Sequence, residues 1–130
     1  MARKKAIITK SSSKSKYKNI RFTVVTNFNG QSCKLKFDSK KEMNRGLELI
    51  KKQDEKIIHS LEFQKKFVVV PKQDGEREAS YICDAFYFDN VKNKWIVEDT
   101  KSERTRKLQT YVLKRKLVKY QNKNIEFLEV

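Results

Sequence analysis

The order of strand-like and helix-like segments is the feature that most constrains the fold of this 130-residue chain. The strand-like segments are short, rich in β-branched and aromatic residues, and separated by turn residues. Along the chain they follow as two strands (19–28, 31–37), a helix (39 to about 53–56), three strands (60–71, 78–88, 94–101), a helix (102–120) and a strand (125–130). This order predicts an α/β domain of mixed α+β type, with one central mixed sheet flanked by helices. Because the last strand follows a helix, we expect it to lie parallel to 94–101.

Local signals support the first hairpin and the first helix. Asn29-Gly30 is the commonest two-residue hairpin turn, and it separates the first two strands. Ser39, with Glu42 three residues later, has the spacing of a capping box at a helix start. The helix that follows is predicted to bury an apolar stripe of Met43, Leu47 and Ile50.

The charge of the chain is strongly basic and unevenly distributed. There are 31 Lys and Arg residues against 16 Asp and Glu, which gives a net charge of +15. Residues 1–18 hold seven basic and no acidic residues, and residues 101–120 hold eight basic and one acidic. Two basic blocks of this kind favour a nucleic-acid partner over a merely soluble or ribosome-associated basic protein. We expect 1–18 to be a flexible basic arm and 19–130 to form a single domain.

Composition excludes several other classes of protein. With three Gly and one Pro, the chain is neither collagen-like nor a Pro/Gly-rich disordered segment. We expect no membrane association, because no apolar run approaches the ~20 residues of a membrane span. The basic N-terminus lacks the apolar region of a signal peptide, and Cys33 and Cys83 fit no disulfide framework or metal motif. A cytoplasmic protein with reduced core thiols is therefore expected.

Asp84 stands out within the strand predicted at 78–88. Strict alternation would place it on one face with Ile82 and Phe86, so that a carboxylate interrupts an apolar row. An ionised, unpaired carboxylate is costly to bury, and a metal ion or a basic residue would compensate it. The alternative is that Asp84 lies at a strand end in contact with solvent.

Asp99 and Lys101 form a second pattern of interest. At positions i and i+2 of a strand they project side by side, which suits a carboxylate that binds a cation and an amine that orients water. The alternative is a surface ion pair worth ~0–1 kcal/mol. If the chain turns at 89–93, Asp84 lies near Asp99 on the adjacent strand, and the two carboxylates can share one Mg²⁺.

Five short blocks in this order resemble the PD-(D/E)XK nuclease superfamily. More closely, they resemble a family of small phage and bacterial proteins described as phage-type or Holliday-junction-type endonucleases. The blocks are 37–42 (FDSKKE), 61–64 (LEFQ), 81–84 (YICD), 97–101 (VEDTK) and 114–117 (KRKL). The resemblance covers about residues 15–130. It implies a restriction-endonuclease-like αβββαβ core preceded here by the N-terminal hairpin.

The resemblance also implies an active site. Position by position, the family's acidic ligands fall on Glu42, Asp84 and Asp99, and its catalytic lysine falls on Lys101. Mg²⁺, for which Mn²⁺ substitutes, would be bound by the three acids and the backbone carbonyl of Thr100. Lys101 would orient the attacking water. The competing role of Glu42 is the capping box with Ser39.

The implied substrate is DNA in a bacterial or phage-infected cytoplasm, and the implied activity is Mg²⁺-dependent endonucleolytic hydrolysis. We expect a structure-specific enzyme acting on junctions, flaps or nicks during phage or mobile-element DNA processing, and a homodimer where both strands are cut. Basic residues near the second helix are the expected DNA contacts, although solvated surface charge is an equal alternative for the helical lysines. They are Arg104, Arg106, Lys107, Lys114 and Lys116.

Two rival functions share the same charge pattern. One is a non-catalytic nucleic-acid-binding protein, in which the acids are merely ion-pair partners. The other is a phage protein with a degenerate nuclease fold that binds a host factor. Both differ from the nuclease in needing neither Asp84, Asp99 nor Lys101.

Overall fold

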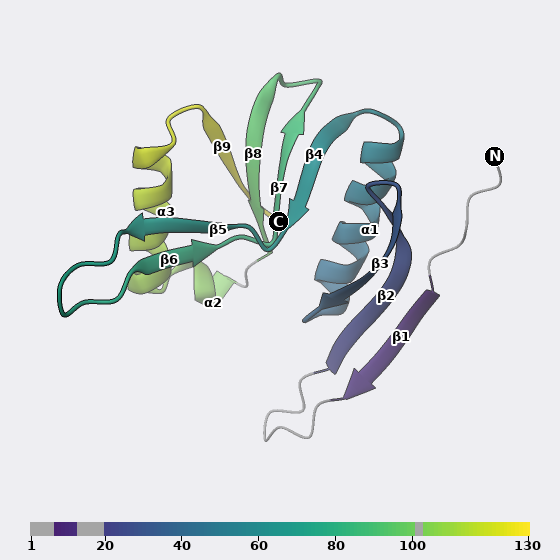
Figure 1. The fold of residues 1–130 in the computed structure, drawn as a ribbon, viewed down its shortest axis with the longest axis horizontal. Coiled ribbons are helices and arrows are strands. Elements are labelled where there is room, and N and C mark those ends of the chain that lie inside the picture. Colours follow the sequence, from purple (N-terminus) through teal and green to yellow (C-terminus); the bar gives the residue numbers. More distant parts are fainter. Residues whose placement is uncertain (1–6, 13–19, 101–102) are drawn as a thin grey trace. The chain divides into compact units, whose positions relative to one another are not determined.

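The computed structural model describes residues 7–12, 20–100 and 103–130 (Figure 1). The chain forms two compact units, 1–51 and 52–130. The described residues have a mixed α/β fold with three helices and a mixed sheet, as the sequence predicts in outline, but their strands form three sheets and not the one central sheet expected. Within them, no helix combines the length and the apolarity needed to cross a membrane.

The first unit contains an antiparallel sheet in the order β1-β2-β3. Its strands are β1 (Ile7–Ser12), β2 (Ile20–Phe28) and β3 (Gln31–Phe37). The predicted hairpin is confirmed, since Asn29 and Gly30 turn with φ of 54° and 78°. The expected flexible arm is wrong for residues 7–12, because their β-branched side chains suit the strand that pairs with β2. The remainder of that arm, 1–6 and 13–18, lies outside the described residues.

The helix α1 (Lys40–Asp54) follows and begins as predicted. The Ser39 hydroxyl accepts a hydrogen bond from the backbone N–H of Glu42 at 3.0 Å. The Glu42 side chain reaches back and accepts one from the backbone N–H of Asp38 at 3.3 Å. The buried stripe differs slightly from the prediction, because it is centred on Gly46 and this places Leu47 at its border. The buried members are Met43, Gly46, Leu49 and Ile50.

The second unit is built on a four-stranded sheet in the order β4-β7-β8-β9. Its strands are β4 (Ile58–Phe63), β7 (Ala85–Asp89), β8 (Lys94–Asp99) and β9 (Ile125–Glu129). Neighbours are antiparallel except β8 and β9, which are parallel. The predicted crossover through a helix is therefore confirmed.

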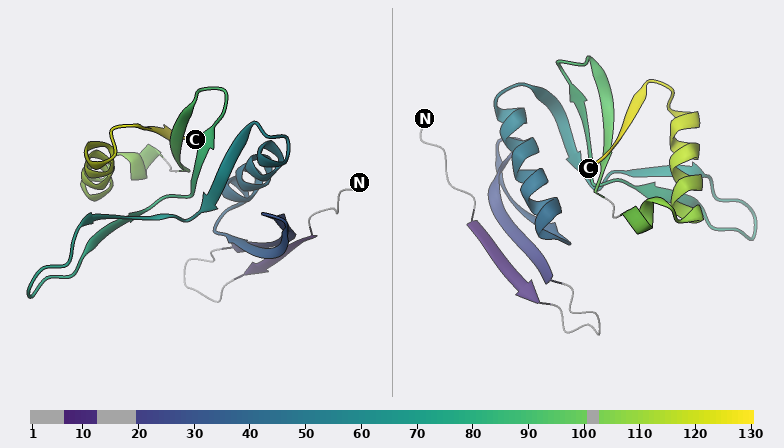
Figure 2. Two further views of the ribbon diagram at one scale, coloured as in Figure 1. Left: turned by 45° about the horizontal axis from the view of Figure 1, so that its top comes forward. Right: turned by 180° about the vertical axis from the view of Figure 1, so that it is seen from behind.

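Two segments predicted as single strands are each broken in two. The stretch 60–71 divides into β4 and β5 (Lys66–Val70), and 78–88 divides into β6 (Ala79–Ile82) and β7. The breaks face each other, since the Gln64 N–H donates to the Asp84 carbonyl at 3.0 Å and the Cys83 N–H donates to the Lys65 carbonyl at 3.1 Å. Beyond them β5 and β6 pair as a separate hairpin, which extends away from the four-stranded sheet (Figure 2).

The predicted helix over 102–120 is also wrong as a single element. It consists of a short helix, α2 (Glu103–Arg106), and a longer one, α3 (Gln109–Gln121). Leu108 separates them because its backbone is extended, with φ −64° and ψ 129°. Tyr111 and Val118 of α3 are buried, whereas Leu108, at the break, is 53% exposed.

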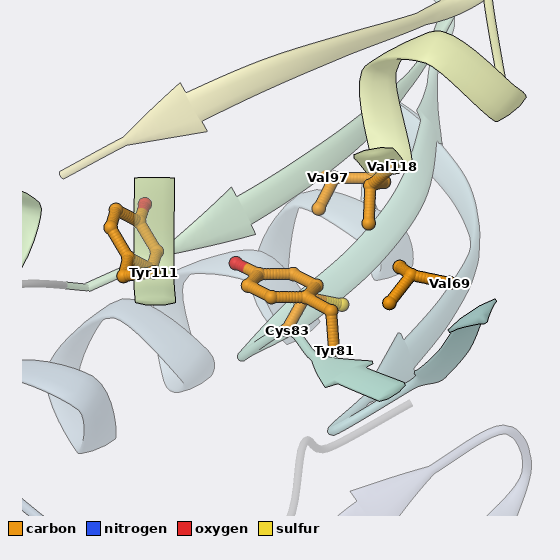
Figure 3. Packing of buried hydrophobic residues seen from close by; sticks show 6 residues of the cluster. All are labelled: Val69, Tyr81, Cys83, Val97, Tyr111 and Val118. Atoms are coloured by element: carbon orange, nitrogen blue, oxygen red, sulfur yellow. The ribbon is translucent and has the colours of Figure 1, made fainter. Parts of the chain in front are cut away.

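One core cluster of the second unit lies where α3, the β5-β6 hairpin and the four-stranded sheet meet (Figure 3). Its members come from all three of these parts: Val69, Tyr81, Cys83, Val97, Tyr111 and Val118. Partly buried side chains of β9, among them Phe127, pack against it. One member of this cluster, Tyr81, contacts Asp99, so the cluster adjoins the candidate site described below.

Candidate functional site: two carboxylates at a strand end

The candidate site lies where β8 ends and β7 begins. Strand register pairs Ala85 with Glu98, so Asp84, directly before β7, comes to the end of β8. On the other side, the parallel register pairs Asp99 with Glu129 of β9. Since registered partners share a face, Asp99 and Glu129 lie on the face that also carries Val97 and Phe127.

Asp84 reaches the site through a hydrogen bond across the strand ends. Its Oδ2 accepts from the backbone N–H of Thr100 at 2.6 Å. The apolar row expected around this carboxylate is not formed, because the strand is interrupted at Cys83 and Asp84. The same interruption leaves Asp84 half-buried and beside the peptide that joins Asp99 to Thr100.

Asp99 is fully buried, with 0% of its surface exposed. Its Oδ2 accepts a hydrogen bond from the Tyr81 hydroxyl of β6, a residue that stands opposite Phe67 in the β5-β6 hairpin. Burial, and then this carboxylate, raise the pKa of Tyr81 well above its ordinary value. A phenol that stays protonated is a dependable donor, so Tyr81 supplies part of the compensation that a buried carboxylate requires.

A second tyrosine lies close by on α3. The ring centroids of Tyr111 and Tyr81 are 6.3 Å apart. The Tyr111 hydroxyl is buried and has no hydrogen-bond partner within the described part of the chain. Burial first, and then the charges of Glu129 and Asp99, raise the pKa of Tyr111 to about 12. This hydroxyl is thus a buried, protonated polar group that responds to the charges of the acids.

The charges of both carboxylates affect the pKa of the Cys83 thiol. The thiol is fully buried, and its pKa is raised to about 12, mainly by burial. The charges of Asp99 and Asp84 contribute to this increase, while a hydrogen bond with the backbone of Lys65 opposes it. Because one thiol senses both acids, the negative potentials of Asp84 and Asp99 overlap in this part of the core.

Glu129 links the site to the basic helices. It forms an ion pair with Arg106 of α2, with 3.1 Å between Nε and Oε2, and its Oε1 accepts a hydrogen bond from Arg115 Nη1 of α3 at 2.8 Å. Arg106, expected to contact DNA, is therefore already engaged with a carboxylate. The ion pairs hold β9, α2 and α3 together beside Asp99.

The other basic residues expected to contact DNA lie at different depths. Arg104, Lys107 and Lys116 are exposed, and Lys114 is half-buried. Lys107 and Lys116 line one hollow of about 330 Å³ on the surface of α3, together with Gln109, Val112 and Leu113. The break at Leu108 brings these two lysines to the same hollow, so they are the better placed pair for a phosphate contact.

Two residues of the implied active site lie outside the described part of the second unit. Glu42 belongs to the first unit, where its side chain caps α1 in the capping-box role expected as its alternative. Lys101 lies outside the described residues. Among residues that are described, no group of three or more His, Cys, Asp or Glu gathers as a metal site. The convergence of all four residues therefore stays a prediction.

The donor set that the described structure does bring together is made of oxygen atoms. Asp84 and Asp99 supply carboxylates, and two carboxylates are what Mg²⁺ commonly takes from a protein, along with water. One oxygen of each is occupied by Thr100 or Tyr81, and a carboxylate has about four acceptor positions. The chemistry of the donors therefore fits a hard divalent cation, although two acids alone are fewer than the three implied.

Sequence reasoning missed several members of the site. Tyr81 was not singled out, because a tyrosine in a β-rich segment normally packs in the core. Glu129 had a usable signal: the predicted parallel pairing of the last strand with 94–101 places an acid beside Asp99. Arg115 lies next to the expected Lys114 and Lys116, but only the position of Glu129 shows which of the three faces the acids.

Comparisons with protein-family models, with curated proteins and with solved structures find no match for this chain. Its function is therefore inferred from its own residues and their contacts. What the cluster offers chemically is a pair of adjacent carboxylates, two protonated phenols and nearby arginines at the end of a buried strand.

Proposed function

We propose that this protein is a Mg²⁺-dependent endonuclease that hydrolyses phosphodiester bonds of DNA, with Asp84, Asp99 and Lys101 at its active site and Glu42 as a further ligand. The observation that carries the proposal is the hydrogen bond between the Asp84 carboxylate and the Thr100 N–H. It brings acids from two neighbouring β-segments to one strand end, immediately before Lys101.

The architecture and the charge give further support. The strand order β4-β7-β8-β9, with a parallel last strand after a helix, is compatible with the restriction-endonuclease-like core that the sequence resemblance implies. A net charge of +15 supplies the electrostatic attraction that a DNA substrate requires. A homodimer, with one site for each strand, would serve a reaction that cuts both strands.

Each residue has a defined task in this proposal. Asp84 and Asp99 hold the cation, and the Thr100 N–H and the Tyr81 hydroxyl fix the orientation of those carboxylates. When bound, Mg²⁺ supplies charge stabilisation at the phosphate and lowers the pKa of a coordinated water. Lys101 orients the nucleophilic water and offsets developing negative charge. Lys107 and Lys116 contact neighbouring phosphates.

One observation favours a second candidate, a DNA-binding protein without catalysis. Asp99 is fully buried and bound to the Tyr81 hydroxyl, and the described residues contain no three-ligand metal group. In that case the acids would serve the core and the basic surface alone would bind DNA. The two candidates differ in whether the acids are needed for a reaction.

The test is cleavage of labelled junction, flap, nicked and linear DNA by the full chain with Mg²⁺, Mn²⁺ or EDTA. We expect cleavage with either metal and none with EDTA. Asp84→Asn is expected to lower the rate at least 100-fold while DNA affinity is unchanged or higher, because a carboxylate facing phosphate is neutralised.

Asp74→Asn is the matched control, since it removes the same charge from an exposed turn at the end of the β5-β6 hairpin. It should leave both cleavage and binding within about twofold of the parent protein. Unaltered cleavage by Asp84→Asn, or equal losses of binding and cleavage, would reject the metal-ligand role and leave the binding protein as the better account.

A further inference from the structure

A cluster of aromatic side chains lies at the far end of the sheet face that carries Asp99. We call it the aromatic patch: His59 of β4, Phe86 and Phe88 of β7, and Trp95 of β8. Register pairs Phe88 with both His59 and Trp95, so the rings share one face. The Phe86 and Trp95 rings stack with centroids 4.9 Å apart and planes 4° apart, and His59 stacks on Phe88 at 4.7 Å. His59 is exposed and the others are half-buried, so the patch reaches the surface.

A hollow of about 360 Å³ adjoins the aromatic patch. Phe86 and Trp95 line one side of it, and the segment from Gln121 to Ile125, which joins α3 to β9, lines the other. Lys123 and Asn124 on this rim are exposed. The hollow thus combines aromatic rings with an amide and an ammonium group, the kinds of group that bind a base by stacking and edge contacts and its phosphate by charge.

The surroundings of the aromatic patch are cationic. Lys65 Nζ lies 5.1 Å from the centroid of the Phe86 ring. Lys123 adds a second ammonium at the hollow. Acidic side chains are also near, since Glu62 pairs with Lys65 at 3.2 Å and Asp89 ends β7. In a chain of net charge +15, this mixture favours a polyanion that also presents flat apolar rings.

We propose that the aromatic patch and its hollow bind unpaired bases of single-stranded nucleic acid. Bases stack on the rings of the aromatic patch where they reach the surface, the Asn124 amide contacts a base edge, and Lys65 and Lys123 contact phosphates. Bases in an intact duplex are stacked on one another and present no free ring face, so the patch selects unpaired segments. The choice of nucleic acid as the occupant rests on the proposed function.

The position of the aromatic patch gives the proposal a consequence for substrate choice. Trp95 and Asp99 are four residues apart on one strand, which corresponds to about 13 Å. A strand held at the aromatic patch is therefore within a few nucleotides of the carboxylate pair. DNA with an unpaired segment next to the cleaved bond, such as a flap or a junction, is the expected substrate class.

The test uses Trp95, the one tryptophan of the chain, as its probe. The full-length protein, in EDTA so that no cleavage occurs, is titrated with labelled oligo(dT) and with a blunt duplex of equal length. Fluorescence anisotropy of the DNA gives the affinity, and tryptophan emission reports on the aromatic patch. We expect oligo(dT) to quench Trp95 and the duplex to leave its emission nearly unchanged at saturation.

Phe88→Leu is expected to weaken oligo(dT) binding about tenfold, within the range for loss of one stacked base, with little effect on the duplex. Phe28→Leu is the matched control, a half-buried strand phenylalanine of the other unit, and should change neither affinity. Lys123→Gln, on the exposed rim, avoids any loss of folding and should lower the salt dependence of oligo(dT) binding by about 0.7 log unit per log unit.

Binding of oligo(dT) without any change in Trp95 emission would overturn the proposal, as would equal losses in Phe88→Leu and Phe28→Leu. Failure of the two proposals can be told apart. Quenching by oligo(dT) without Mg²⁺-dependent cleavage rejects the nuclease alone, whereas cleavage without quenching rejects the aromatic patch alone. Absence of binding to either DNA rejects both.

Discussion

The contact with Tyr81 gives Asp99 a structural role in addition to its proposed role as a metal ligand. Asp99 was singled out from its spacing to Lys101, yet a carboxylate with 0% exposure also needs a structural partner. The Tyr81 hydroxyl is that partner, and it comes from a hairpin whose existence depends on the break at Cys83 and Asp84. The spacing to Lys101 indicates Asp99 but not its donor, because Tyr81 lies on a hairpin that belongs to another sheet.

Tyr81→Phe is expected to lower the free energy of unfolding by about 1–3 kcal/mol, because it leaves a buried carboxylate without its phenol donor. Urea denaturation followed by Trp95 emission measures this in the second unit. Tyr120→Phe is the control, since Tyr120 is 75% exposed and should change stability by less than about 0.5 kcal/mol. Equal stability of the two variants would contradict the role given to the Tyr81 hydroxyl.

Cys83 gives a prediction in alkaline solution. Its pKa is raised from an ordinary 9.0 to about 12, so the neutral thiol is favoured in the folded state. The resulting stability is fully present below about pH 9 and is lost as pH rises toward 12, at up to about 1.4 kcal/mol per pH unit. Cys83→Val removes this titration, so urea denaturation from pH 8 to pH 11 should show a shallower decline than in the parent protein.

The same burial predicts the chemical reactivity of the thiol. In a Cys33→Ser variant, where Cys83 is the remaining thiol, iodoacetamide at pH 8 should label the native protein slowly and the urea-unfolded protein rapidly. Labelling at the same rate in both states would show that Cys83 is not buried with the carboxylates.

At the scale of elements, the sequence predicts the order of the helices and strands better than it predicts where they are interrupted. The hairpin, the first helix and the parallel last strand follow from turn residues, the cap and the crossover rule. The breaks within the predicted strands could not be predicted in this way, because 60–71 contains no Gly or Pro before Pro71. Gln64 turns the chain there with a φ of 52°, although glutamine is not a residue typical of turns. The helix break at Leu108 likewise lacks a Gly or Pro signal.

Glu129 is the residue that ties these elements together. Glu129→Gln weakens its ion pairs with Arg106 and Arg115 and is expected to cost about 1 kcal/mol of stability, since these side chains are only partly exposed. Glu126→Gln on the same strand is the control, because its pair with Lys92 is more exposed and is worth ~0–1 kcal/mol. Urea denaturation of both variants that ranked Glu126→Gln as the more harmful would contradict the linking role of Glu129.

At the scale of the whole molecule, the net charge and the fold support different parts of the proposed function. The net charge of +15 indicates a polyanionic partner but assigns no reaction. The strand order brings Asp84 to Asp99, and this could be anticipated from a turn at 89–93. The roles of Glu42 and Lys101 could be inferred only from the resemblance of short sequence blocks. The central claim is therefore that acids distant in the sequence share one cation.

Determination of the crystal structure of the full chain grown with Mn²⁺ tests that claim most directly, with the metal located by its anomalous scattering. The account predicts one ion bound directly by oxygens of Asp84 and Asp99, at close to the ~2.1 Å typical of Mg²⁺ sites, with Glu42 completing the acidic ligands. It is contradicted if Mn²⁺ binds elsewhere or not at all, while Asp99 remains bound to Tyr81 and Asp84 to Thr100.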